Sequence, residues 1–182
     1  MSDFQVYTIE SAPQDSKPAL EALKAAFGFI PNVAGAMALS PVTMSGFVGL
    51  FRNIHDGNFS EAQIQTVLLT NAVTNKCTWA VAFHSFLARK EGLSEEDVAA
   101  IRKGGAPKDR KLAALSVLAR TLIENRGRIG HGDVQQFLGA GYEKEHVLEV
   151  IGVVAASTIA NYVGSVAHPP LEDDFRPYAW SV

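Results

Sequence analysis

One cysteine and one histidine stand at a spacing that could support thiol chemistry. Cys77 and His84 are seven residues apart, which is two turns of an α-helix, so their side chains would share one helix face. The same spacing corresponds to a rise of roughly 10 Å, so a third group or a water would have to relay a proton between them. The pair is therefore a candidate nucleophile, Cys77, with a proton carrier, His84.

The position of Cys77 favours the charged thiolate. The pattern predicts that a helix begins at this residue, and the free backbone N–H groups and positive dipole end of a helix stabilise a thiolate. The neighbouring Lys76 acts in the same direction. The alternative is that Cys77 is a small buried apolar residue, as single cysteines commonly are, and that His84 is structural.

The elements that would position these residues are helical along nearly the whole chain. Ser60 is suited to cap a helix over residues 61–75, and a second helix is predicted over residues 77–90. Only residues 4–9 show the alternation of a strand. Further helices are predicted over residues 16–27, 32–39, 41–55, 94–104, 109–125, 131–138 and 143–166.

These patterns predict an all-α fold with one domain over residues 1–182. Its core would span about residues 16–166. A tail at residues 167–182, rich in proline and aromatic residues, would lie on the body of the protein or on a partner subunit. The longest apolar stretch, residues 147–167, is expected to be a buried core helix, partly covered by a partner subunit.

Composition limits the class of protein further. The chain has 182 residues, of which 47% are apolar, and this fraction is enough for a packed core. Its net charge of −3 does not suggest a basic surface that would bind nucleic acid or an anionic membrane. A single cysteine cannot form an internal disulfide. The N-terminus has no signal or transit pattern, and no uninterrupted apolar run reaches the ~18 residues of a membrane span. The expected location is the cytoplasm.

Several segments together carry a family resemblance. They are FGFIPNVAGAMALSPVTM at residues 27–44, LFRNIHDGNFSEAQIQTVLLTNAVTNKCTWAVAFHSFLA at 50–88, EGLSEEDVAAIRKG at 91–104 and LEDDF at 171–175. The chain resembles the alkylhydroperoxidase D/carboxymuconolactone decarboxylase superfamily, and more closely its peroxidase-related branch. The resemblance implies an all-α AhpD-like fold and a homo-oligomer, with the site near a subunit interface.

The family's site resembles Glu-x11-Cys-x-x-Cys-x-x-x-His. By position, the first cysteine is Cys77 and the histidine is His84, whereas Ala80 and Gln65 replace the second cysteine and the glutamate. Ala80 removes the thiol that would pair with His84 four residues on, and with it the internal disulfide. Gln65 cannot accept a proton as a carboxylate would. The resemblance therefore implies a one-cysteine site in which Gln65 holds a substrate oxygen or a water.

Three further residues are candidates at the edge of this site. His55 is either a histidine at a helix C-terminus or part of the pocket mouth. Glu61 is either a helix N-terminal charge or a substitute for the missing carboxylate. Trp79 is either a packing residue or a substrate contact. The histidines lack zinc-ligand spacing, so neither a metal nor another cofactor is expected.

The sequence predicts the first of the following three functions, and the other two are alternatives. In the first, Cys77 reduces small hydroperoxides, passes through a sulfenic acid and is restored by an external thiol reductant. In the second, the protein is a carboxymuconolactone decarboxylase-type enzyme that acts on a small organic acid or lactone without using a thiol. In the third, it is a non-catalytic binding protein on the same fold.

Overall fold

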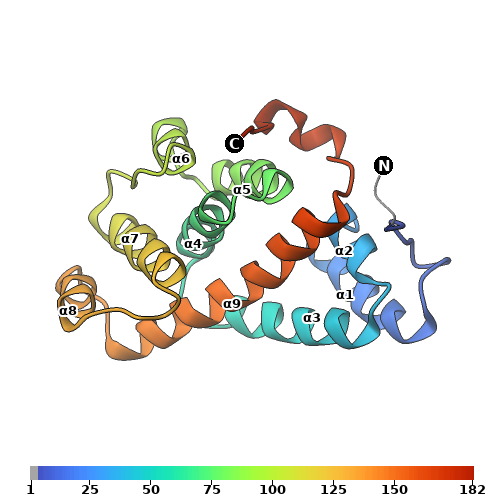
Figure 1. Cartoon of the computed structure of the whole chain (residues 1–182), viewed down its shortest axis with the longest axis horizontal. Coiled ribbons are helices and arrows are strands. Elements are labelled where there is room, and N and C mark those ends of the chain that lie inside the picture. The colour runs from blue at the N-terminus through green and yellow to red at the C-terminus, as the bar shows by residue number, and fades with distance from the viewer. Residues whose placement is uncertain (1–3) are drawn as a thin grey trace.

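The computed structural model describes residues 4–182, and this part of the chain is helical with no strand. The all-α prediction is confirmed, and Figure 1 shows the arrangement. The α-helices are α1 (Lys17–Phe27), α2 (Asn32–Met37), α3 (Pro41–His55), α4 (Glu61–Thr74), α5 (Thr78–Lys90), α6 (Glu95–Arg102), α7 (Arg110–Glu124), α8 (His131–Gly139) and α9 (Lys144–Ala167). Two 3₁₀ helices are also present, η1 (Gln14–Ser16) and η2 (Asp173–Tyr178).

Helices α4 and α5 form the centre of the molecule (Figure 1). Every residue of α4 from position 64 to 72 is buried, as is every residue of α5 from 79 to 85. Helices buried around their whole circumference belong to the core, and α4 packs against α5, α7 and α9. The predicted start of α4 is confirmed: Ser60 Oγ accepts from Gln63 N at 3.4 Å, and Gln63 Oε1 accepts from Ser60 N at 2.9 Å.

Helix α9 crosses the molecule from the α7–α8 end to α2 (Figure 1) and contacts α2, α3, α4, α5 and α7. Its inner side buries Val150 and Val153, whereas Leu148, Tyr162 and Val166 are more than half exposed. The prediction of a buried core helix is therefore right for one side only. By length and composition α9 could span a membrane, a test that core helices of soluble proteins also pass, and 39% of its most apolar window is buried.

The C-terminal tail lies on the body of the protein. Helix η2 packs on α5, and Phe175 is almost fully buried beside Phe83 and Phe86. Arg102 donates hydrogen bonds to the carbonyl oxygens of Tyr178 at 2.7 Å and Ala179 at 3.0 Å. The tail is thus part of the wall around α5.

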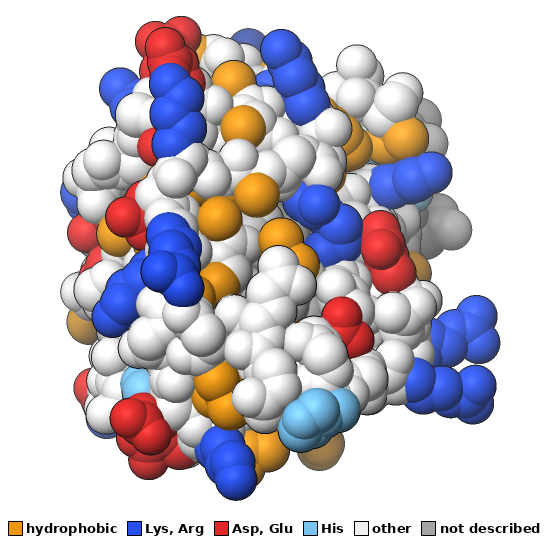
Figure 2. Space-filling model, turned by 90° about the vertical axis from the view of Figure 1, so that its left-hand side faces the viewer, with side chains coloured by type: hydrophobic (Ala, Val, Ile, Leu, Met, Phe, Trp, Pro, Cys, Tyr) orange, Lys and Arg blue, Asp and Glu red, His pale blue; other side chains and the backbone are white. Residues whose placement is uncertain are grey.

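The surface at the α6–α8 end mixes the two signs of charge. Figure 2 shows basic and acidic groups interspersed on this face, with small apolar patches between them. One such contact joins Lys108 and Glu96. This face therefore presents no field of a single sign.

We predict that Gly35→Ala destabilises the fold, because the N-terminal segment crosses α2 at this glycine. A Cβ at Gly35 would lie 2.6 Å from Val6 Cγ1 and 2.8 Å from the Tyr7 carbonyl oxygen. To relieve the second contact, the backbone at Tyr7 would have to move. We expect a loss of about 1–3 kcal/mol in the free energy of unfolding, measured by urea denaturation. The control is Gly46→Ala in α3, which meets no atom within 4 Å and should gain roughly 0.5–1 kcal/mol. Equal stabilities of the two variants would contradict the prediction.

Candidate functional site

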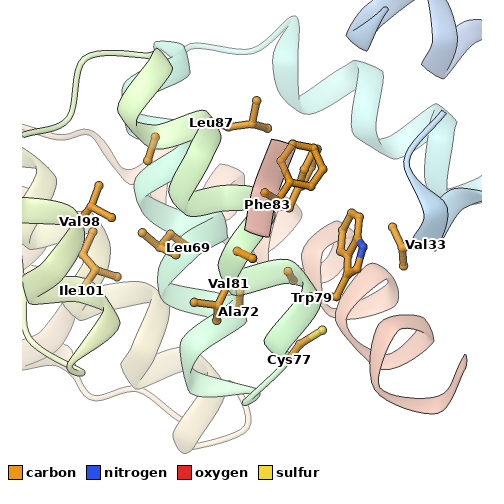
Figure 3. Packing of buried hydrophobic residues seen from close by; sticks show 14 of the residues in the cluster. Val33, Leu69, Ala72, Cys77, Trp79, Val81, Phe83, Leu87, Val98 and Ile101 are labelled. Atoms are coloured by element: carbon orange, nitrogen blue, oxygen red, sulfur yellow. The ribbon is translucent and has the colours of Figure 1, made fainter. Parts of the chain in front are cut away.

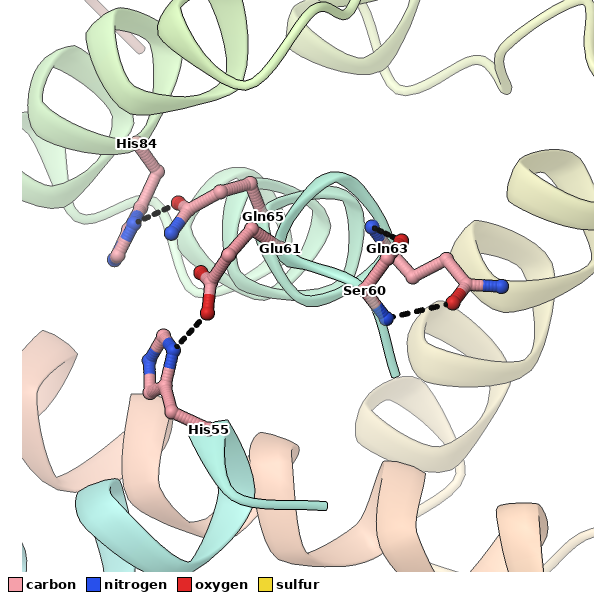
Figure 4. A network of polar contacts seen from close by, with 6 residues as sticks. All are labelled: His55, Ser60, Glu61, Gln63, Gln65 and His84. Atoms are coloured by element: carbon pink, nitrogen blue, oxygen red, sulfur yellow. Dashed lines mark hydrogen bonds and ion pairs between the residues drawn. The ribbon is translucent and has the colours of Figure 1, made fainter. Parts of the chain in front are cut away.

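A hydrogen bond between two buried side chains joins α5 to α4 at the site. His84 Nδ1 lies 3.1 Å from Gln65 Oε1, and the two residues are 7% and 4% exposed. With the amide oxygen as acceptor, Nδ1 carries the proton and Nε2 keeps a free lone pair. Figure 4 shows the second ring nitrogen directed away from Gln65. Burial lowers the pKa of His84 to about 3, with a smaller contribution from nearby His55, so the imidazole is neutral at physiological pH.

A second pair joins the end of α3 to the start of α4. His55 Nδ1 lies 2.8 Å from Glu61 Oε1 (Figure 4), and the His55 ring packs on Phe51 with centroids 4.2 Å apart. His55 Nε2 is buried and has no hydrogen-bond partner in the described part of the chain. His55 is thus both the last residue of α3 and part of a pocket wall, and Glu61 holds its imidazole.

Two cavities meet at the His84–Gln65 hydrogen bond. Gln65 lines an outer, polar cavity of about 400 Å³, whereas His84 lines an inner, apolar cavity of about 40 Å³. Phe27 and Phe51 line both and therefore lie between them. The outer wall also includes Arg52, His55, Asp56, Glu61, Leu87, Lys90 and Glu91. The inner wall also includes Leu23, Pro31, Val33, Ala34, Phe47, Leu68, Trp79, Ala80, Phe83 and Ala160.

The thiol of Cys77 is sealed in the core. It is 1% exposed at the N-cap position of α5, and Figure 3 shows it at the base of the cluster that contains Trp79. Helix α9 covers it, since a Cβ at Gly164 would lie only 2.9 Å from the sulfur. Burial raises the pKa of Cys77, and the opposing effects of the Ala80 N–H, the Ser165 hydroxyl and the Trp79 N–H are smaller. The predicted thiolate is therefore wrong, because desolvation outweighs the helix start.

The structure does not bring Cys77 and His84 together. Cys77 faces α9, whereas the His84 ring is bound to Gln65 on α4. Ala80, four residues before His84, shares the inner cavity with the imidazole. The position that faces the imidazole therefore holds a methyl group and no sulfur.

Trp79 is both a packing residue and a cavity wall. Its ring stacks on Phe83 with centroids 4.9 Å apart, and its Nε1 donates to Glu172 Oε2 at 2.9 Å. No local pattern assigns a role to Glu172, although its segment is among those that carry the resemblance. Phe27 and Phe51 could not be predicted as site residues either, because nothing local to either residue indicates a cavity between them. Within residues 4–182, no cluster of three or more His, Cys, Asp or Glu side chains could hold a metal ion.

Comparisons with known proteins agree with this architecture. Residues 41–121 match the model of the carboxymuconolactone decarboxylase family. An uncharacterised peroxidase-related protein from Ralstonia eutropha JMP134, an alkylhydroperoxidase AhpD core, superposes with a TM-score of 0.83 at 16% identity, covering 96% of this chain and 94% of that one. A second peroxidase-related protein, from Silicibacter sp. TM1040, gives 0.78 at 16% identity, covering 95% and 92%. The debrominase Bmp8, in its C82A form with 2,3,4-tribromopyrrole, gives 0.78 at 15% identity, covering 98% and 96%. No curated protein sequence matches the chain.

The fold and the arrangement of α4 and α5 define an AhpD-like helical protein. The carboxymuconolactone decarboxylase family model matches residues 41–121, from α3 into α7, and the fold is similar to that of the peroxidase-related AhpD-like proteins.

We predict that Cys77 reacts slowly with alkylating reagents. Because burial both raises its pKa and blocks access, the folded protein should be alkylated by iodoacetamide at least 100-fold more slowly than the urea-unfolded chain at pH 8. Mass spectrometry over time measures both rates. A fast folded-state reaction with a midpoint below pH 8 would contradict the assignment of a sealed thiol.

We predict that Gln65→Glu raises the pKa of His84 by at least two units, because a carboxylate facing Nδ1 stabilises the imidazolium. A ¹H–¹³C NMR titration of the ring, assigned with His84→Gln, measures it. Gln135→Glu, at an exposed position on α8, is the control and should leave the titration unchanged. A His84 pKa that stays below 4 in Gln65→Glu would contradict the role given to this hydrogen bond.

The same variant should change how stability depends on pH. In the native protein the pKa of His84 is about 3, below its unfolded value of ~6.5. Between these two values His84 is protonated in the unfolded chain and neutral in the folded chain. The free energy of unfolding therefore decreases as the pH falls from ~6.5 towards 3. This loss should shrink in Gln65→Glu, as urea denaturation at pH 4, 5.5 and 7 would show.

Proposed function

We propose that this protein is a small-molecule enzyme that uses acid–base groups and does not need its thiol. The observation that carries the proposal is the His84–Gln65 hydrogen bond at 3.1 Å, which fixes a neutral imidazole at an apolar cavity while the one thiol is covered by α9. This is the carboxymuconolactone decarboxylase-type alternative. His84, Gln65, His55 and Glu61 are its proposed site residues.

The proposed chemistry divides between the two pairs. With Nδ1 donating to Gln65, His84 Nε2 accepts a hydrogen bond from a hydroxyl or acid group of the substrate. A pKa of about 3 makes this nitrogen a weak base, so it orients a proton more readily than it removes one. His55 and Glu61 line the outer, polar cavity and are placed to exchange protons with solvent, as acid–base catalysis requires.

The two cavities support a substrate with an apolar part and a polar part. The inner wall is mainly apolar and aromatic, and the outer wall carries both basic and acidic side chains. A small organic acid or lactone matches this division. Trp79 and His55, one on each cavity, are the proposed substrate contacts.

Reduction of small hydroperoxides by Cys77 is the second candidate. Two backbone N–H groups and the Ser165 hydroxyl do favour the thiolate, and the peroxidase-related neighbours share the fold. This route requires α9 to move off the sulfur and an external thiol to reduce the sulfenic acid.

We also propose that the protein forms a homo-oligomer, as the resemblance implies, because apolar residues of α9 are exposed. The proposed location is the cytoplasm.

We predict that the two candidates separate in a pair of variants. Activity is assayed on small hydroperoxides with dithiothreitol, and on carboxylated lactones. On the substrate that is turned over, Cys77→Ala should keep more than half of kcat/KM. His84→Asn should lose about 100-fold or more, the scale of removing one fixed hydrogen-bonding group from the transition state.

His131→Asn, at an exposed histidine, is the matched control and should keep full activity. The opposite pattern, with Cys77→Ala inactive and His84→Asn active on hydroperoxides, would replace the leading proposal with the thiol candidate. Full activity in both Cys77→Ala and His84→Asn would contradict both candidate functions.

A further inference from the structure

The carboxylate of Glu172 joins two walls of the inner cavity. One oxygen accepts from Trp79 Nε1 at 2.9 Å, and the other accepts from the backbone N–H of Asn32 at 2.7 Å. Asn32 Nδ2 also donates to the carbonyl oxygen of Pro170 at 3.0 Å. Glu172 therefore ties the tail to the first turn of α5 and to the start of α2.

Both anchored elements supply residues that line the cavity beside His84. Trp79 is itself a wall residue, and Val33 and Ala34, which follow Asn32, form the wall that α2 contributes. Behind them, Phe175 of the tail meets Phe83 edge to face, with centroids 5.1 Å apart. One carboxylate thus holds the α2 and α5 walls at a fixed separation.

Burial disfavours the charged form of the Glu172 side chain. Burial raises the pKa of Glu172, and the hydrogen bonds from Asn32 and Trp79 oppose that shift. None of the ion pairs among the described residues includes Glu172. A partly buried carboxylate without a cation is unfavourable unless its hydrogen bonds satisfy it, and the bonds that do so end on the two cavity walls.

We propose that Glu172 is a positioning residue that sets the width of the inner cavity and so limits the size of the group that can reach His84. The inference rests on the proposed function, because it assumes that the substrate's apolar part enters this cavity. At about 40 Å³, the cavity is far smaller than an apolar cavity of ~150 Å³ that binds benzene. When the carboxylate is removed, Trp79 is free to move and a larger group fits.

The test uses Glu172→Ala, Glu172→Gln and the control Asp174→Ala, which removes an exposed carboxylate two residues away. Hydrogen exchange of the Trp79 indole N–H, followed by ¹⁵N NMR and assigned with Trp79→Phe, should be at least tenfold faster in Glu172→Ala. It should be intermediate in Glu172→Gln, which keeps one acceptor oxygen. Asp174→Ala should match the unaltered protein.

The second measurement uses benzene as a probe of cavity width. Its dissociation constant, followed through the His84 ring signals, should be at least threefold lower in Glu172→Ala than in Asp174→Ala. Unchanged indole exchange, or faster exchange with unchanged benzene binding, would overturn the proposal. If Glu172→Ala does not fold, Glu172→Gln must show faster indole exchange and tighter benzene binding, each to a smaller extent. A Glu172→Gln variant that matches the unaltered protein in both measurements would also overturn the proposal. Neither measurement depends on catalytic turnover. Failure of the proposed function would be seen in a different result, namely that the His84→Asn variant keeps its activity.

Discussion

The buried contact between α4 and α5 determines where polar side chains can lie in the centre of this fold. Both helices are buried over their central turns, so each polar side chain between them must find a partner inside the protein. His84 and Gln65 satisfy each other there, and the low pKa of His84 follows from the same burial. The packing that stabilises the centre of the fold therefore also fixes the protonation state of the imidazole.

The same desolvation separates this site from dithiol chemistry. The one sulfur lies at the start of α5, where backbone N–H groups favour a thiolate, yet α9 removes it from water and the net effect is a raised pKa. The residue that shares a cavity with His84 is Ala80. The polar groups at the two cavities are instead the His84 imidazole, the Gln65 amide and the His55–Glu61 pair.

The tail supports two walls of the inner cavity. Glu172 binds Trp79 and the start of α2, and Phe175 fills the space behind Phe83. The outer, polar cavity instead lies at the α3–α4 junction, where His55 meets Glu61. The inner cavity is therefore supported by the tail, whereas every residue that lines the outer cavity lies within residues 26–91.

Local signals in the sequence determined the helices and, through their order, the fold class. Ser60 and Gln63 mark the start of α4, and the helix bounds agree with the predicted ranges to within a few residues, because capping and apolar periodicity act between near neighbours. The segments over residues 27–44, 50–88 and 91–104 also indicated the resemblance to a family whose model matches residues 41–121.

The electrostatics and the walls of the site depend on contacts between segments that are distant in the sequence. The helix start at Cys77 is visible in the sequence, but the cover supplied by Gly164 is not, nor is the bond between Trp79 and Glu172, 93 residues apart. The physical reason is that desolvation depends on which distant segments exclude water from a group, and no local pattern records them.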